Sequence, residues 1–156
     1  MTEPTEKKKK QDTTLESEGA EFLVLGLLLV EGISAYKAYI NFPGYDLTAV
    51  NPDTKKAARI QVKSRWATDY DMSFPLKNLD CDFVVHVALN RGYRFSKKNK
   101  ADNNGGVKEP AFYVFPIDVM AKARNEIGWN KVQIKKIENL EAYKDNWALI
   151  REFLTK

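Results

Sequence analysis

The stretch GYDLTAVNPDTKKAARIQVKS, residues 44–64, predicts a β-hairpin. Its middle, Asn51–Thr54, reads NPDT and is a strong turn signal. On either side, Tyr45–Val50 and Ala58–Ser64 have the apolar and β-branched content of strands. Folding the chain symmetrically about the middle of this turn places Asp46 opposite Gln61, which fixes the register that the rest of the interpretation uses.

This register sorts the hairpin side chains into two faces. Opposed residues of antiparallel strands share a face, and so do residues two apart on one strand. Asp46, Gln61 and Lys63 therefore share one face. The apolar residues of the same strands take the other face and pack in the core: Tyr45, Leu47, Ile60 and Val62. An acid, an amide and a lysine gathered on one side of an apolar hairpin predict a functional site.

The arrangement Asp46-x14-Gln61-x-Lys63 resembles the catalytic hairpin of the PD-(D/E)xK nuclease superfamily. In that family an Asp closes one strand, and a Glu or Asp, any residue and then Lys follow on the next. The text QVKS at Gln61–Ser64 is similar to the strand of resolvase-like and homing-endonuclease-like members, and Gly44 also fits. The resemblance covers about residues 15–90. It implies an α/β, restriction-endonuclease-like fold with a mixed central sheet flanked by helices.

One departure from the family pattern concerns the second acid, which is Gln61 here and marks a QxK branch. A hard divalent cation prefers anionic oxygens but accepts an amide carbonyl, and some branches of the superfamily use Gln at this place. The loss of one negative charge leaves an alternative to an active nuclease, which is a catalytically inactive nucleic-acid-binding module of the same fold. A third alternative is a protein-interaction domain in which the three polar residues are only structural.

The resemblance implies a metal-dependent endonuclease that hydrolyses phosphodiester bonds, with Mg²⁺ or Mn²⁺ as cofactor and DNA as partner. RNA stays open as a substrate, and a homodimer would allow both strands to be cut. The implied catalytic residues are Asp46, Gln61, Lys63 and Glu21, with Asp46, Gln61 and the carbonyl of Val62 as metal ligands. Glu21 would come from the first helix, and Glu18 remains the alternative acid there.

Length, charge and cysteine content agree with an intracellular globular protein. The 156 residues, 44% of them apolar, suit one domain over residues 15–156 behind a disordered basic arm, residues 1–14. A net charge of +4 is compatible with nucleic acid but not diagnostic of it. The single cysteine, Cys81, forms no internal disulfide, which favours a reducing cytoplasm. Cys81 is expected to be buried filler.

An apolar run, FLVLGLLLV at Phe22–Val30, is too short to span a bilayer. We therefore expect a buried helix over Leu15–Val30. The remaining elements are expected in the following order: strand Ile33–Ile40, a helical turn at Leu76–Leu79, a central strand Asp82–Leu89, strand Pro110–Phe115, helix Ile117–Glu126, edge strand Lys131–Ile137 and an amphipathic helix at Asn146–Leu154. His86, in the central strand, is expected to be a hydrogen-bonded core residue.

Two segments offer cations for nucleic acid. Arg65 follows the QxK strand directly and would touch DNA beside the scissile phosphate. The polar loop after the central strand combines cations with the aromatic residues Tyr93 and Phe95, which suits groove insertion or base stacking. A solvated loop is the alternative. The candidate phosphate-binding residues of this loop are Arg91, Arg94, Lys97, Lys98 and Lys100.

Overall fold

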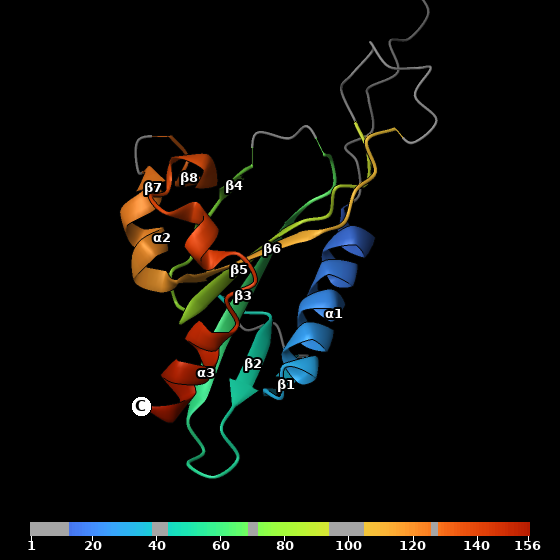
Figure 1. The fold of residues 1–156 in the computed structure, drawn as a ribbon. Coiled ribbons are helices and arrows are strands. Elements are labelled where there is room, and N and C mark those ends of the chain that lie inside the picture. The colour runs from blue at the N-terminus through green and yellow to red at the C-terminus, as the bar shows by residue number, and fades with distance from the viewer. Residues whose placement is uncertain (1–12, 39–43, 69–71, 94–104, 126–127) are drawn as a thin grey trace, which may run out of the picture.

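The computed structural model describes residues 13–38, 44–68, 72–93, 105–125 and 128–156. A five-stranded sheet in the order β1-β2-β3-β5-β6 forms its centre, with helices packed on it (Figure 1). The strands are β1 (Ser34–Lys37), β2 (Leu47–Val50), β3 (Ala57–Arg65), β5 (Phe83–Ala88) and β6 (Ala111–Pro116). The helices are α1 (Thr14–Val30), α2 (Ile117–Ala123) and α3 (Ala148–Thr155). Strands β3 and β5 run parallel and the other neighbours antiparallel, so the predicted α/β fold with a mixed sheet is confirmed.

The hairpin formed by β2 and β3 has the predicted register. The ladder runs from Leu47 opposite Ile60 to Val50 opposite Ala57. The turn is stabilised by Asn51, whose side-chain oxygen accepts a hydrogen bond from the Asp53 amide at 3.0 Å. Asp46 lies one residue before this ladder, and its amide still donates to the Ile60 carbonyl at 2.8 Å.

Strand β5 lies inside the sheet, between β3 and β6, and all six of its residues are buried. Its side chains alternate between two hydrophobic clusters. Phe83, Val85 and Val87 join a cluster that also contains residues of α1 and α3. Val84 joins a second cluster with residues of α2 and of a small sheet, β4-β8-β7. The two faces of the main sheet are thus covered by different elements.

The small sheet was not predicted as such. Its strands are β4 (Ser73–Pro75), β8 (Lys131–Gln133) and β7 (Arg124–Asn125). The expected strand Lys131–Ile137 stops at Gln133 and continues as a 3-10 turn, η1 (Ile134–Lys136), with a second one, η2 (Leu140–Tyr143), farther on. The expected helix from Ile117 ends at Ala123, and the expected helical turn at Leu76–Leu79 is irregular chain. These short elements have too few residues to show a period.

The chain enters β2 through a sharp bend at Gly44. This glycine has φ +103°, and a Cβ atom there would lie 2.9 Å from the Asp80 carbonyl oxygen. The bend separates Tyr45 from the hairpin face that was predicted for it. Leu47 and Ile60 are buried in the first cluster as expected, but Tyr45 packs against the second.

Helix α1 buries one stripe rather than its whole circumference. Ala20, Val24 and Leu28, spaced four residues apart, are fully buried. Leu29 and Val30 of the same apolar run are exposed, so the expectation of a buried helix is correct only for one face. In the described parts of the chain, no helix is both long and apolar enough to cross a membrane.

Two single residues of the core were predicted in part. Cys81 is buried, and burial raises the pKa of its thiol to about 11, which fits an inert filler. His86 is fully buried and stacks on Phe74 with ring centroids 5.3 Å apart. Its ring nitrogens have no hydrogen-bond partner among the described residues, contrary to expectation. Burial lowers the pKa of His86 to about 3, so the ring is neutral.

Candidate active site

Asp46 is fixed by the strands on both sides of it. Its amide donates to the Ile60 carbonyl of β3 at 2.8 Å, and its carbonyl accepts from the Ala38 amide, just after β1, at 2.9 Å. The side chain turns back to β3, where its Oδ2 accepts a hydrogen bond from the Val62 amide at 2.8 Å. The carboxylate therefore lies against the strand that carries Gln61 and Lys63.

Gln61 and Lys63 project from β3 on the face of the second cluster. Gln61 pairs with Val84 in the parallel ladder, and Lys63 pairs with His86. The side-chain oxygen of Gln61 is buried and has no hydrogen-bond partner in the described structure. A buried acceptor without a partner is costly, and a cation held beside Asp46 would satisfy it.

Lys63 carries a partly buried ammonium that has no counterion among the described residues. Burial lowers the pKa of Lys63, and the Asp46 carboxylate opposes that shift without cancelling it. No hydrogen bond or ion pair of this ammonium is found in the described part of the chain. The side chain is thus held near Asp46 and available to an anion.

Glu21 reaches Asp46 from the first turns of α1. Burial raises the pKa of Glu21 to about 7, and the charge of Asp46 and a hydrogen bond between the two carboxyl groups act in the same direction. Two carboxyl groups held this close repel each other when both are ionised. A divalent cation between them would remove that repulsion.

Lys37, at the end of β1, is a site residue that the sequence interpretation missed. Its side chain is almost fully buried, forms an ion pair with Glu18, and lies 3.2 Å from Oε2 of Glu21. Burial alone would lower its pKa, but the hydrogen bonds to the two glutamates outweigh burial and raise the pKa of Lys37. The sequence feature that could have identified Lys37 is the position of a lysine inside the otherwise apolar strand sequence SAYKAYI. Glu18 is exposed and meets Lys37, whereas Glu21 meets both Lys37 and Asp46.

The backbone of Val62 is oriented as a further ligand would require. The carbonyls of Arg59 and Arg65 accept hydrogen bonds from the β5 side, from the amides of Asp82 and Leu89. Successive carbonyls of a strand point to alternate sides, and Val62 lies three residues from each of these two arginines. Its carbonyl therefore points to the β2 side, where the ladder has already ended. It therefore points to the same side as the Asp46 carboxylate.

The described residues contain no group of three or more His, Cys, Asp or Glu side chains that could bind a metal ion. The set found here is instead two carboxyl groups, one unpartnered amide oxygen and one backbone carbonyl. All are oxygen donors, the type that Mg²⁺ and Mn²⁺ prefer. The residues present therefore fit a divalent cation of this class.

The predicted nucleic-acid-binding residues are only partly described. Arg65 is half-buried, and its guanidinium donates to the carbonyls of Ser73 and Ser64 at 2.9 and 3.1 Å, which links β3 to β4. Arg91 is exposed and forms an isolated bridge with Val107. The other four candidates lie outside the described residues: Arg94, Lys97, Lys98 and Lys100.

Comparison with known proteins identifies the fold. A solved structure of the bacterial homing endonuclease I-Ssp6803I matches with a TM-score of 0.57 and 20% sequence identity. The match covers 91% of this chain and 94% of that chain, so the two share a fold over nearly their whole lengths. No family model and no curated protein sequence matches this chain.

Proposed function

We propose that this protein is a metal-dependent endonuclease that hydrolyses phosphodiester bonds in DNA, within the QxK branch of the PD-(D/E)xK superfamily. The observation that carries the proposal is the junction of Asp46, Glu21 and the unpartnered Gln61 oxygen beside β3. The shared fold with a homing endonuclease supports it.

The residues have separate roles in the proposed reaction. Asp46, Gln61, Glu21 and the Val62 carbonyl would hold Mg²⁺ or Mn²⁺, which polarises the phosphate and lowers the pKa of a bound water. The Lys63 ammonium, partly buried and without a counterion in the described structure, stabilises the negative charge that develops on the phosphate. Lys37 holds Glu21 toward Asp46 through their 3.2 Å ion pair.

The test is cleavage of supercoiled plasmid by the purified chain with Mg²⁺, with Mn²⁺ or with EDTA, together with calorimetric titration of the metal. We expect metal-dependent nicking and a saturable metal site. Absence of both would favour the second candidate, a nucleic-acid-binding module without catalysis. That alternative rests on Gln61, which removes one anionic ligand from the site.

Metal affinity is predicted to rise with pH because Glu21 must lose its proton to bind the ion. The pKa of Glu21 is raised to about 7, so a proton is displaced on binding at pH 6 and little is displaced at pH 8. We expect Mn²⁺ affinity to rise about tenfold per pH unit below 7 and to level off above it. Calorimetry in buffers of different ionisation enthalpy counts the released proton.

Glu21→Gln should bind Mn²⁺ more weakly and without this pH dependence. The matched control is Glu138→Gln, at an exposed position outside the site, which should follow the wild type. A wild-type affinity that is constant from pH 6 to 8 would contradict the assignment of Glu21 as a ligand.

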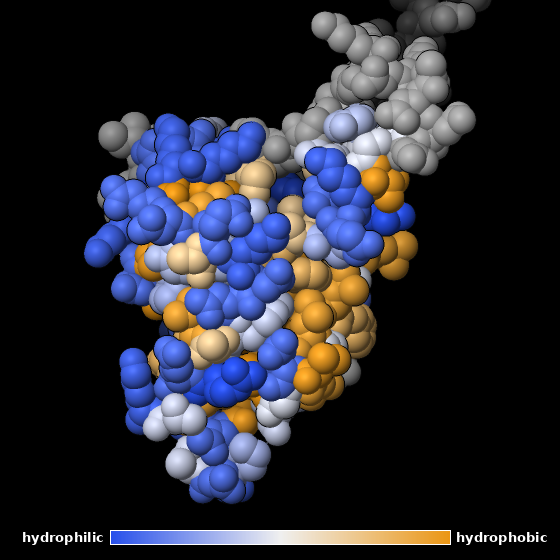
Figure 2. Space-filling view, viewed as in Figure 1, coloured by the Kyte–Doolittle hydropathy of each residue, from blue (hydrophilic) through white to orange (hydrophobic). Residues whose placement is uncertain are grey.

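We further propose that two copies pair through α1, so that two sites face the two DNA strands. Phe22 and Leu29 are seven residues apart, as are Leu23 and Val30, and these exposed residues form one apolar surface. Figure 2 shows apolar side chains gathered where α1 lies. Gly26, between them, has no atom within 4 Å of a Cβ position, which leaves room for a close helix approach.

Placing a charge on this apolar surface is expected to separate the copies. Val30, 81% exposed, costs the single chain little when changed, so Val30→Glu should shift a dimer to monomer in sedimentation at micromolar concentrations. Ser17→Glu adds the same charge to an exposed polar position of α1 and should leave the dimer intact. A wild-type chain that sediments as a monomer at all concentrations would refute the pairing.

A further inference from the structure

Trp129 has the largest exposed fraction, 90%, among the large apolar side chains of the described residues. It lies in the turn between β7 and β8, and its backbone is in the left-handed region with φ 66°, as is that of Asn130 with φ 54°. Bulky residues rarely adopt this conformation. Strained backbone that persists in a folded protein is concentrated at functional sites.

The turn that carries Trp129 is firmly attached to the core. The Leu76 amide donates to the Asn130 carbonyl at 2.9 Å. Val132, the second residue of β8, is fully buried and pairs with Phe74 of β4. The backbone directly after Trp129 is therefore held at Asn130 by Leu76 and in β8 by β4.

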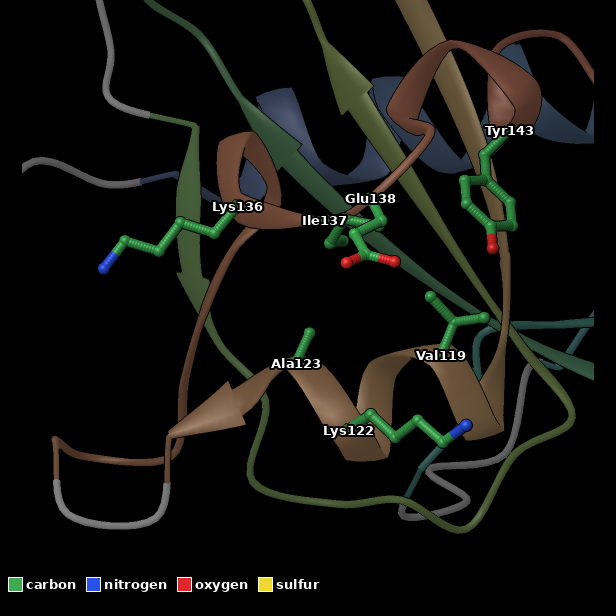
Figure 3. A pocket seen from close by; sticks show the side chains of 7 residues that line it. All are labelled: Val119, Lys122, Ala123, Lys136, Ile137, Glu138 and Tyr143. Atoms are coloured by element: carbon green, nitrogen blue, oxygen red, sulfur yellow. The ribbon is translucent and has the colours of Figure 1, made fainter.

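Two hollows share Lys122, Ala123 and Lys136, and the second also includes Asn125 and Lys131, which border this turn. The first, of about 350 Å³, is shown in Figure 3, where Lys122 of α2 and Lys136 of η1 lie on opposite sides. The carboxylate of Glu138 also lines it, which disfavours an anion there. The second, of about 290 Å³, is lined by Lys122, Ala123, Asn125, Lys131, Gln133 and Lys136, with no acid.

The second hollow has the chemistry of a phosphate-binding surface. No ion pair of Lys122, Lys131 or Lys136 is found within the described ranges, so these three positive charges have no counterion in that part of the chain. The amides of Asn125 and Gln133 add hydrogen-bonding groups between them. Cations beside an exposed aromatic ring are the combination that nucleic-acid-binding surfaces use.

A continuous path of contacts joins this surface to the candidate active site. Lys63 pairs with His86 in the parallel ladder, and the His86 ring stacks on Phe74 at 5.3 Å. Phe74 in turn pairs with Val132, the neighbour of Lys131. The small sheet is therefore attached to the same face of the main sheet from which Gln61 and Lys63 project.

We propose that Trp129 and the second hollow form a DNA-docking surface separate from the catalytic centre. Lys122, Lys131 and Lys136 bind backbone phosphates of a duplex, and Trp129 enters the adjacent groove or stacks on a base. The inference rests on the proposed function, since it takes DNA as the substrate of the same chain. It adds a contact region that neither the arginine and lysine loop nor the hairpin motif predicts.

The test is DNA binding by the full chain in EDTA, where cleavage does not occur. The chain has three tryptophans, of which Trp147 is buried, Trp66 is half-buried and Trp129 is exposed. Acrylamide should quench a large component of the fluorescence that is absent in Trp129→Phe. A duplex oligonucleotide should protect this component. Trp129→Ala should lower duplex affinity about tenfold or more.

The lysines are tested by the salt dependence of binding. Each lysine–phosphate contact contributes about 0.9 to the slope of log affinity against log salt. The combined variant Lys122→Met, Lys131→Met, Lys136→Met should reduce this slope by about 2 to 3. Lys135→Met is the matched control, because this exposed lysine of η1 lines neither hollow. Its effect on the affinity and on the slope should be no larger than that of removing one charge far from the DNA.

The outcomes separate the docking surface from the nuclease proposal. Protection of Trp129 without plasmid cleavage and without a saturable metal site would support the docking surface and reject the nuclease. Cleavage with Trp129 fully accessible to acrylamide in the complex would support the nuclease and overturn the docking surface. Failure to bind duplex at all would overturn both. Protection of Trp129 that depends on protein concentration alone would assign the surface to contact between copies and also overturn it.

Discussion

Asp46→Ala is expected to reduce the rate of metal-dependent plasmid nicking about 1,000-fold. Asp46 is the acid that both the β2–β3 register and the Val62 hydrogen bond place at the site. Loss of a metal-binding carboxylate removes several kcal/mol of transition-state stabilisation, and about 4 kcal/mol corresponds to three powers of ten. Nicking rates under single-turnover conditions, with metal affinity from calorimetry, measure the effect.

Two companion variants separate chemistry from folding. Asp46→Asn keeps an oxygen that can accept the 2.8 Å hydrogen bond from the Val62 amide, but it removes the charge. It should unfold at a temperature close to that of the wild type and remain nearly inactive. Asp53→Ala removes an exposed carboxylate at the other end of the same hairpin and should cleave normally. Normal cleavage by Asp46→Ala would reject the assignment of the site.

The sequence predicts the part of this site that is formed by residues close together in the chain. The NPDT turn and the alternation on both strands determine the register, which places Asp46 next to Gln61 without knowledge of the fold. Turn chemistry and a period of two are short-range signals. For the same reason β5, a continuous apolar run, was recognisable as an interior strand covered on both faces.

The contribution of α1 depends on packing that no local pattern contains. Glu18 and Glu21 lie three residues apart on one helix, and both were candidates for the acid that the first helix contributes. Lys37 of β1 forms ion pairs with both glutamates. What distinguishes them is that Glu21 also interacts with Asp46. The distance between helix α1 and Lys37, the last residue of β1, is a tertiary property, so the sequence interpretation left the choice open and missed Lys37.

The small sheet was missed for a different reason. Strands of two or three residues, such as β7 and β8, carry no measurable period, and helix propensity continues past Ala123. Tertiary pairing of β8 with β4 decides the conformation there. As a result the exposure of Trp129 could not be predicted, although a tryptophan in a basic segment is visible in the sequence.

Lys63→Met is expected to lower the nicking rate about 100- to 1,000-fold while raising the thermal stability of the protein. The loss of rate follows because the ammonium is the charge that faces the developing negative charge of the phosphate. The gain in stability follows because the partly buried ammonium has no ion pair in the described structure, and burial lowers the pKa of Lys63. A purely structural lysine would show the opposite stability effect.

The pH dependence of stability gives a second readout of the same residue. Burial lowers the pKa of Lys63 in the folded protein below its ordinary value of 10.5, so the unfolded chain binds more protons at pH values between the folded pKa and 10.5. Wild-type stability should therefore receive a favourable contribution as pH rises toward 10.5, and this contribution should be absent in Lys63→Met. Denaturant titrations of both proteins at pH 7 and pH 10 compare the two directly. The control is Lys135→Met, at an exposed position, which should keep the wild-type pH dependence and full cleavage. A destabilised Lys63→Met that still cleaves would show that Lys63 supports the fold and that another group stabilises the phosphate.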